Sequence, residues 1–284
     1  MRVLLVPNTA NAAAVAATAE LATWLVGRGF EPVLSATDAN LSGLPDLGIA
    51  PSEIGEPVLV VALGGDGTIL KAVHLLGEAE VPVLGVKYGR LGFLSGSGPG
   101  AMRQAVETAL AGEARVERRT TLHAEVVMEG RTAGRYRALN EVVVSRGASA
   151  RVVALDVAID GHQVISTRAD GVIVATATGS TAYALSAGGP VVAPGFSGMV
   201  VVPVAPHTLR TRALVTGASD VVEITLPDPA RSDACVVVDG EPTPCRRSVD
   251  RVIVSRGDHD VLLVKLDGRD FYETVAAEFF GSER

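Results

Sequence analysis

The sequence has little cysteine, few aromatic residues and no excess of positive charge. Among 284 residues there are two cysteines, Cys235 and Cys245, which lie outside any CxxC spacing and have no histidine cluster nearby. This spacing does not indicate a zinc site, and we expect reduced thiols, with a disulfide between the two cysteines as the alternative. The net charge of −7 and the isoelectric point near 5.3 argue against a nucleic-acid or anionic-membrane partner.

Long apolar runs are also missing, because none approaches the ~20 residues that cross a bilayer. The apolar opening, residues 1–6, is too short for a signal-peptide core and predicts a strand instead. We therefore expect a cytoplasmic protein, and its hydrophobic content of 48% is ample for a packed core. In so acidic a chain, any site for a polyanion must be built from backbone amides, a few basic side chains or a metal ion.

The most informative stretch is residues 59–71, which read LVVALGGDGTILK. The β-branched apolar run predicts a buried parallel strand, and helical periodicity begins at Thr68. Glycines between a strand and a helix form an anion site, since backbone N–H groups and the helix dipole can face a phosphate. A loop that binds only phosphate would avoid a carboxylate, so Asp66 indicates a base or a metal contact. The alternative is a plain tight turn in which Asp66 caps the helix.

Strands and helices alternate along the first 115 residues, which predicts an open parallel α/β (Rossmann-like) domain with its ligand site at the carboxyl ends of the strands. The glycine-rich residues 85–100 predict a loop that approaches another group closely. The predicted strands are 2–7, 33–35, 59–63 and 83–86, and the predicted helices are 11–28, 68–76 and 101–111.

From Thr120 onward the pattern changes to short alternating or β-branched runs, which predict a β-sandwich-like domain. We expect an α/β domain at 1–115, a β-rich domain at 116–266, and a C-terminal helix at 267–284 that docks on the first domain. The predicted strands of the second domain are 121–128, 136–145, 151–160, 163–168, 171–176, 199–204, 221–226, 234–238, 250–255 and 261–266.

Two further polar motifs interrupt apolar runs in the second half. Residues 170–190 run from a strand into a Thr-Gly-Ser-Thr turn and a short helix, closed by Gly-Gly-Pro. The hydroxyls, the helix amides and the ring of Tyr183 could bind a nucleotide, although a Ser/Thr N-cap explains most of this pattern. Asn140 and Glu141 begin another apolar strand, where an amide and a carboxylate could bind a ribose or a base edge, or simply face solvent. The glycine turn at 64–68 and the hydroxyl-rich turn in 170–190 lie on opposite sides of the expected domain boundary, and such a pair predicts a small-molecule site in a crevice between the domains.

Together these motifs resemble the bacterial ATP-dependent NAD kinase family. The shared features are the GGDGT turn at 64–68, the Asn-Glu pair at 140–141 and the long segment at 170–190, in the same order. Segments 203–209 and 239–241 look like two later family segments, and the resemblance extends roughly from 58 to 241. GGDGT also occurs in lipid kinases of the diacylglycerol and sphingosine type, whereas the segment at 170–190 is typical of NAD kinases.

The resemblance implies transfer of the γ-phosphoryl of ATP to the 2′-hydroxyl of the adenosine ribose of NAD, giving NADP, with Asp66 as the general base. Mg²⁺ or another divalent cation would be bound mainly through the ATP phosphates. Family members form dimers or tetramers in which a neighbouring subunit completes the site. The implied donor-phosphate loop is Gly64, Gly65, Gly67 and Thr68. The implied NAD-binding residues are Asp66, Gly67, Lys71, Phe93, Asn140, Glu141, Arg151, Arg168, Asp170, Thr178, Thr181, Ala182, Tyr183, Ser186, Ala205 and Glu241.

Two alternatives stay open at this point. A lipid or other small-molecule kinase with a GGDGT turn would have an apolar groove around Tyr183, and a dinucleotide-sensing module would bind without turnover. The chain also departs from the family pattern at Lys87, Ala177 and Glu241, where asparagine, proline and glutamine are usual. These departures concern the fit of the substrate and not the type of reaction.

Overall fold

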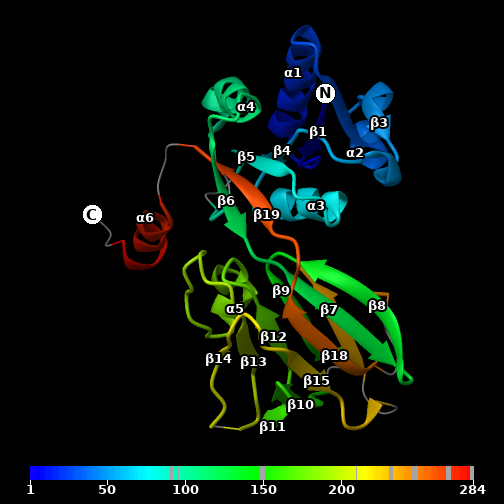
Figure 1. Ribbon diagram of the computed structural model, residues 1–284, viewed down its shortest axis with the longest axis vertical. Helices are drawn as coiled ribbons and strands as arrows, with labels where there is room; N and C mark the ends of the chain where they lie inside the picture. The colour runs from blue at the N-terminus through cyan, green and yellow to red at the C-terminus, as the bar shows by residue number, and fades with distance from the viewer. Residues whose placement is uncertain are drawn as a thin grey trace. The chain divides into compact units, whose positions relative to one another are not determined.

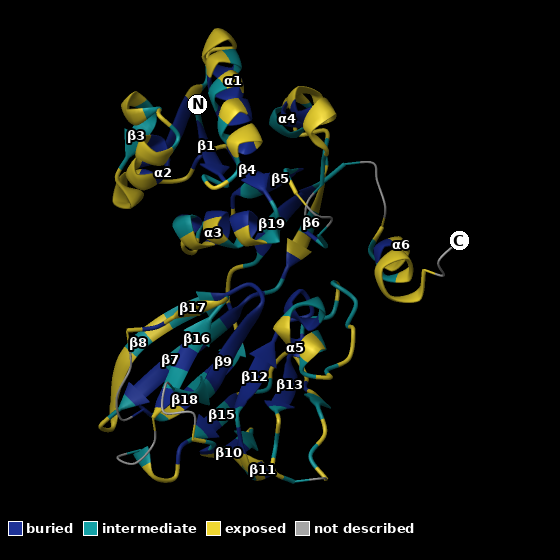
Figure 2. Cartoon of the chain, turned by 180° about the vertical axis from the view of Figure 1, so that it is seen from behind, coloured by how far each residue is buried: buried dark blue, intermediate teal, exposed yellow. Residues whose placement is uncertain are grey.

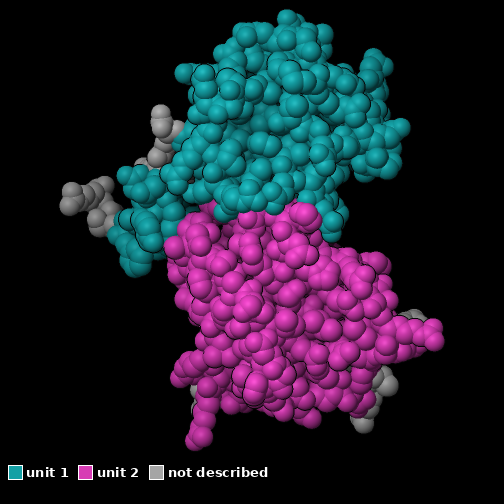
Figure 3. Space-filling model, viewed as in Figure 1, with its two compact units in different colours: residues 1–118, 261–284 teal, residues 119–260 magenta. Residues whose placement is uncertain are grey.

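The computed structural model divides the chain into two compact units (Figure 3). Unit 1 comprises Met1–Arg118 and Val261–Arg284, and unit 2 comprises Arg119–Asp260. The helices of the described part of the chain include none long and apolar enough to cross a membrane. Cys245 and parts of the predicted segments 85–100, 203–209 and 267–284 lie outside the described residues. The structure describes residues 1–89, 92–94, 96–147, 151–208, 210–229, 233–244, 249–266 and 270–281.

Unit 1 is built on one mainly parallel sheet, which has seven strands within the described ranges (Figure 1). The strand order is β3-β2-β1-β4-β5-β19-β6, and β1 pairs in parallel with β2 on one side and with β4 on the other. The predicted parallel α/β sheet is therefore confirmed. The strands are β1 (Arg2–Pro7), β2 (Glu31–Ser35), β3 (Gly48–Ile49), β4 (Leu59–Gly64), β5 (Pro82–Lys87), β6 (Arg115–Arg119) and β19 (Val261–Lys265).

Helices cover both faces of this sheet (Figure 1). The N-cap of α1 is Asn11, whose side chain accepts hydrogen bonds from the backbone amides of Ala13 and Ala14. The apolar faces of α1 and α4 share one core with the sheet, and α3 packs on β1, β4 and β5 outside that core. The helices are α1 (Ala12–Gly27), α2 (Ala36–Leu41), α3 (Asp66–Leu76) and α4 (Met102–Leu110), with 3-10 turns at Pro45–Leu47, Pro51–Glu53 and Pro99–Ala101.

The C-terminal segment also belongs to unit 1. The strand predicted at 261–266 in the β-rich domain is observed as β19, but it pairs in parallel with β5, with Leu262 opposite Pro82 and Leu263 opposite Val83. Strand propensity indicates that a segment is extended, and it does not say which sheet the segment joins. The chain then forms α6 (Phe271–Val275), which continues as a π-helix, η6 (Ala276–Phe280).

Unit 2 is a β-sandwich, as predicted. Its described residues form two six-stranded sheets, in the orders β11-β10-β15-β18-β7-β8 and β14-β13-β12-β9-β16-β17. Valine-rich inner faces of both sheets meet in one buried core, seen as dark positions in Figure 2. The strands are β7 (Leu122–Met128), β8 (Arg131–Ala138), β9 (Glu141–Arg146), β10 (Val153–Ile159), β11 (His162–Ala169), β12 (Gly171–Ala175), β13 (Val200–Val204), β14 (Leu214–Val215), β15 (Val222–Thr225), β16 (Ala234–Val238), β17 (Glu241–Pro242) and β18 (Val249–Arg256).

One strand prediction in this unit is wrong. The run at 136–145 was predicted as a single strand, whereas the structure has two strands, β8 and β9, in different sheets. The chain leaves the first sheet after Ala138 and enters the second at Glu141, so Leu139 and Asn140 form the corner. The run itself contains no signal for such a change of sheet, because strand propensity indicates an extended segment and does not say which sheet it joins.

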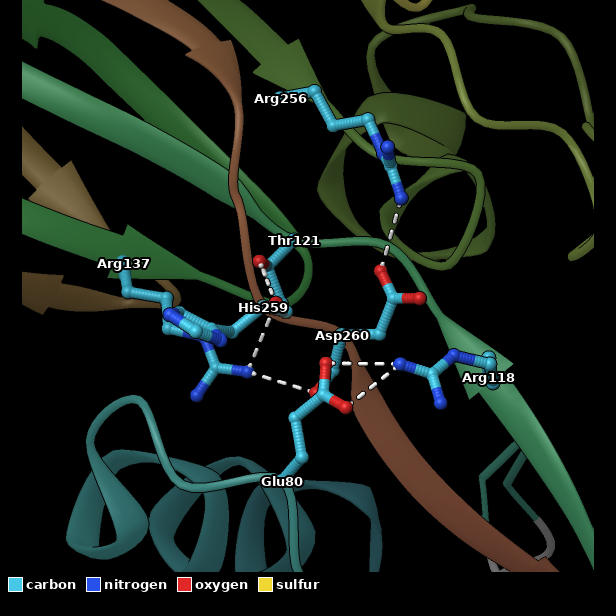
Figure 4. Close-up of polar contacts among 7 residues, drawn as sticks. All are labelled: Glu80, Arg118, Thr121, Arg137, Arg256, His259 and Asp260. Atoms are coloured by element: carbon cyan, nitrogen blue, oxygen red, sulfur yellow. Dashed lines mark hydrogen bonds and ion pairs between the residues drawn. The ribbon is translucent and has the colours of Figure 1, made fainter.

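The chain passes between the units after residue 118 and again after residue 260. In unit 1, Nη2 of Arg118 donates to both carboxylate oxygens of Glu80, at 2.9 Å to Oε1 and 2.7 Å to Oε2. In unit 2, the Arg137 guanidinium donates hydrogen bonds of 3.2 Å to the carbonyl oxygens of His259 and Asp260 (Figure 4). Charged hydrogen bonds therefore hold each crossing segment within its own unit.

Candidate active site

The turn after β4 has the predicted strand, glycine and helix order. Gly65 is the N-cap of α3, and Asp66 is the first helical residue. No side chain makes a capping hydrogen bond at this helix start, so the alternative in which Asp66 caps the helix is wrong. The carboxylate of Asp66 is engaged elsewhere, by the loop at 92–94.

A pocket of about 340 Å³ opens beside this turn. It lies where β2 and β4 flank β1 on opposite sides, which is the switch point at which open α/β sheets bind their ligands. Residues that follow β1 and residues that begin α3 meet there because β1 and β4 are parallel neighbours. Asn8 and Thr9 were not predicted, because the sequence after the first strand contains no recognised motif. The pocket is lined by Pro7, Asn8, Thr9, Gly65, Gly67, Thr68 and Lys71.

The glycines of the turn serve two different purposes. A Cβ on Gly64 would overlap the Thr68 hydroxyl, so this glycine allows the turn to pack against its own helix. A Cβ on Gly65 or Gly67 would meet no protein atom within 4 Å. The missing side chains at these two positions therefore leave open space toward the pocket, next to the positive end of the α3 dipole. This arrangement suits an anion.

Lys71 supplies positive charge to the pocket and is itself paired. Its ammonium forms an ion pair with Asp38, which lies in the first turn of α2. The Asp38 side chain is 1% exposed, whereas that of Lys71 is 42% exposed. Among the described residues, Oδ2 of Asp38 has no hydrogen-bond partner, so Lys71 is the main compensation for this buried charge. The sequence contained no signal for the role of Asp38, which belongs to no recognised motif.

The Asp66 carboxylate is held by backbone amides of the glycine-rich loop after β5. The N–H of Phe93 donates to Oδ2 at 2.9 Å, and the N–H of Leu94 donates to Oδ1 at 3.2 Å. A Cβ on Gly92 would overlap the carboxylate, so only glycine lets the loop come this close. The loop was predicted to approach another group closely, and that group is Asp66.

In unit 2, the predicted pair Asn140 and Glu141 is buried, with 9% and 7% of their surfaces exposed. The Asp239 carboxylate accepts three backbone hydrogen bonds from this corner, from Leu139 and Asn140 at 2.7 Å and from Glu141 at 3.0 Å. Asp239 and Gly240 have φ values of 48° and 86° and form the two-residue turn between β16 and β17. The predicted segment at 239–241 thus supports the Asn-Glu corner through Asp239, a role that was not predicted.

The Glu141 side chain carries a strongly perturbed carboxyl. Burial, and then the nearby Asp239 carboxylate, raise the pKa of Glu141 to about 7. Within the described part of the chain, Oε2 of Glu141 is buried without a hydrogen-bond partner. A buried polar atom of this kind is a candidate for binding a hydroxyl or an amine of a ligand.

The hydroxyl-rich turn after β12 packs directly on the Asn140 corner. The Thr176 hydroxyl donates to the carbonyl oxygen of Leu139 at 2.6 Å, and a Cβ on Gly179 would overlap the carbonyl oxygen of Asn140. The buried Arg119 side chain donates to the Thr178 hydroxyl at 3.3 Å. Much of the Thr-Gly-Ser-Thr pattern therefore builds the turn, which begins as a 3-10 helix, η4 (Gly179–Thr181), followed by α5 (Tyr183–Ser186).

A second polar cluster lies at the other end of β12. Asp170 precedes this strand and pairs with Arg146 at 2.7 Å, and Ala205 follows the neighbouring strand β13. Ala205 has a φ of 45°, a strained conformation for alanine that is typical of functional sites. The last residue of β12, Ala175, pairs with Glu141, so Asp170 lies five residues along the strand from the Asn140 corner, or about 17 Å at ~3.3 Å per residue. The structure therefore separates the predicted unit 2 residues into two clusters.

The remaining predicted residues differ in exposure. Thr178 is buried, while Thr181 and Ala182 are partly buried. Tyr183, which was expected to stack on a base, is 45% exposed and available to do so. Among the predicted residues of unit 2, the side chains open to solvent are those of Arg151, Arg168, Tyr183, Ser186, Ala205 and Glu241.

The described residues contain no group of three or more His, Cys, Asp or Glu side chains that could hold a metal ion.

Family models match most of the chain. The ATP-NAD kinase N-terminal domain matches residues 51–114, and the ATP-NAD kinase C-terminal domain matches residues 139–266. An NAD kinase from Geobacter metallireducens is 36% identical and covers 93% of both chains. An NAD kinase from Symbiobacterium thermophilum is 38% identical and covers 98% of both chains.

Solved structures agree with these matches. A yeast NADH kinase complexed with NADH has a TM-score of 0.88 and 28% identity, covering 100% of this chain and 89% of its own. An NAD kinase from Archaeoglobus fulgidus in complex with ATP has a TM-score of 0.71 and 25% identity, covering 94% of each chain.

Proposed function

Because this chain belongs to the NAD kinase family and is a kinase that phosphorylates NAD, we propose that Asp66 is the general base of the reaction. The γ-phosphoryl of ATP passes to the 2′-hydroxyl of the adenosine ribose, and Asp66 takes the proton of that hydroxyl as its oxygen attacks phosphorus. ADP leaves with the electrons of the broken P–O bond, and NADP is formed. The observation that carries this role is the position of Asp66, at the first residue of α3 beside the switch-point pocket.

The pocket is proposed to bind the polyphosphate of ATP. Open space at Gly65 and Gly67, the start of α3 and the Lys71 ammonium suit a polyanion such as a triphosphate. The Archaeoglobus fulgidus relative was solved in complex with ATP, which supports nucleotide binding by this fold. Mg²⁺ or a similar cation would arrive on the ATP phosphates and neutralise charge that develops on them. Gly64 contributes to this loop through packing against Thr68.

The Asn140 corner is proposed to bind the dinucleotide. The unpartnered Oε2 of Glu141 can bind a ribose hydroxyl, and the Asn140 amide can bind a base or ribose edge. Tyr183 offers an exposed ring for stacking, and Thr178 and Thr181 stand on the turn that packs on this corner. The yeast relative was solved with NADH, which supports dinucleotide binding by this fold.

The second cluster is proposed to serve the site of a neighbouring copy in a homodimer or homotetramer. Asp170 and Ala205 lie at the opposite end of β12 from the Asn140 corner, which supports their use in a different dinucleotide site. The exposed Arg168 belongs to the same end, because its carbonyl oxygen accepts the His207 amide. We place the reaction in the cytoplasm, since ATP and NAD are charged nucleotides that do not cross a bilayer unaided.

Replacement of Asp66 by Asn tests the base directly. The amide keeps the shape of the side chain and removes its basicity, so kcat should fall by about 10²–10⁴-fold. The dissociation constant for NAD, measured by calorimetry, should change less than about threefold if Asp66 acts on the bound substrate. Asp46→Asn, at an exposed position of the same unit, is the matched control. Normal turnover by Asp66→Asn would show that another group takes the proton.

A further inference from the structure

The loop that holds the Asp66 carboxylate is not part of a helix or strand. Phe93 and Leu94 each donate one amide hydrogen bond to Asp66, and Gly92 lies against the same carboxylate. A segment without regular hydrogen bonding needs other contacts to keep its backbone in place. Whatever fixes Phe93 therefore also fixes the orientation of Asp66.

Contacts from the C-terminal part of the chain hold Phe93 on both its backbone and its ring. The Lys265 ammonium, at the end of β19, donates to the Phe93 carbonyl oxygen at 3.4 Å. The Phe93 ring stacks on the Phe279 ring, with centroids 5.9 Å apart and an interplanar angle of 17°. It also meets the Phe271 ring at 6.2 Å with a tilt of 51°. Both ring distances lie in the range of favourable aromatic pairs.

The segment that carries these rings is itself anchored at its start. A capping box joins Asp270 and Glu273, with the Glu273 amide donating to Asp270 at 2.8 Å and the Asp270 amide donating to Glu273 at 3.1 Å. Phe271 follows this cap directly, so its ring is presented from a defined helix end. Phe279 is 40% exposed, whereas the adjacent Phe280 is 79% exposed. The two neighbouring phenylalanines thus have different surroundings.

We propose that Phe271 and Phe279 are positioning residues for phosphoryl transfer, which hold Phe93 and thereby orient the Asp66 carboxylate. This inference rests on the proposed function of Asp66 as the base. Its physical basis is that a general base acts only within a narrow range of distance and angle. Each Asp66 oxygen accepts one loop amide, which fixes the orientation of the carboxylate and leaves each oxygen a lone pair with which to accept a proton.

The test compares full-length Phe279→Ala, Phe279→Leu and Phe279→Tyr with Phe280→Ala as the matched control. Expected results are a fall in kcat of about tenfold or more for the Ala and Leu variants, with KM for ATP and NAD within about twofold. The Tyr variant keeps the ring, so its kcat should stay within about twofold of the wild-type value. Phe280→Ala should also keep kcat within about twofold of wild type, because the Phe280 side chain is 79% exposed. The Leu variant keeps apolar volume, so it provides the measurement if the Ala variant does not fold.

Several outcomes would overturn the inference. An unchanged kcat in the Leu variant, a rise in KM without a fall in kcat, or an equal loss in Phe280→Ala would each show that the ring of Phe279 does not position Asp66. Asp66→Asn, assayed in parallel, separates this failure from that of the proposed function. If Asp66→Asn loses turnover while Phe279→Leu keeps it, Asp66 remains the base and the positioning role is rejected. If Asp66→Asn turns over normally, the base assignment itself fails.

Discussion

Glu141→Gln should change how the stability of the protein depends on pH. Burial, and then the Asp239 charge, raise the pKa of Glu141 from its ordinary 4.5 to about 7 in the folded protein. Each pKa unit corresponds to ~1.36 kcal/mol, so the folded state favours the protonated carboxyl by about 3 kcal/mol. Because the folded pKa lies above the unfolded pKa, this stabilisation is complete below about pH 4.5 and is lost as the pH rises to about 7.

The measurement is urea-induced unfolding of wild type and Glu141→Gln between about pH 4.5 and pH 8. Subtracting the two free energies of unfolding removes the contribution of groups that titrate equally in both proteins. Between about pH 4.5 and pH 8, the free energy of unfolding of Glu141→Gln should rise by about 3 kcal/mol relative to that of wild type, because glutamine does not titrate. Glu125→Gln, at a partly buried carboxyl whose pKa is lowered by the Thr132 hydroxyl, is the control and should show no such gain. A difference for Glu141→Gln that is independent of pH would refute the reasoning.

Two further predictions concern the turn and the assembly. Gly179→Ala places a Cβ on the carbonyl oxygen of Asn140, a backbone atom that cannot move easily. The free energy of unfolding, measured by thermal unfolding, should therefore fall by about 1–3 kcal/mol. Gly195→Ala is the control and should change it little, because its Cβ would meet no atom within 4 Å. If each site of a dimer takes Asp66 from one subunit and Asp170 from the other, mixing and re-equilibrating Asp66→Asn and Asp170→Asn subunits should restore activity to about a quarter of wild type. About half of the re-formed dimers are then hybrids, and each hybrid has one intact site out of two. Activity no higher than that of the separate variants would place Asp66 and Asp170 in the same subunit's site or remove Asp170 from the site.

Most of the fold could be predicted because its signals are local. Residues 2–7 were predicted as a strand with the observed bounds, and Asn11 and Gly29 mark the ends of α1 as capping rules require. The β-sandwich followed from short β-branched runs at regular spacing. The errors arose where a strand changes sheet, at Leu139, or joins a distant one, as β19 does. Alternation within a run cannot encode these choices, because either partner sheet would bury the same face.

The sequence by itself determined the family and the chemistry it carries out. The glycine turn around Asp66, the Asn-Glu pair and the long segment at 170–190 are contiguous motifs, and a contiguous motif can be recognised without knowing what lies opposite it. The alternatives of a lipid kinase and a non-catalytic sensor were separated from NAD kinase by the relatives, which share 36–38% identity over most of the chain.

Only the tertiary structure decided which residues support those motifs. Asp38 meets Lys71 across 33 positions, Phe93 meets Asp66 across 27, and Asp239 receives the Leu139 amide across 100. Each contact joins elements that strand pairing brings together, so it depends on the order of strands in a sheet and not on local propensity. Local patterns in this chain therefore specify the reacting groups, and the topology of the two sheet systems selects the side chains that hold them.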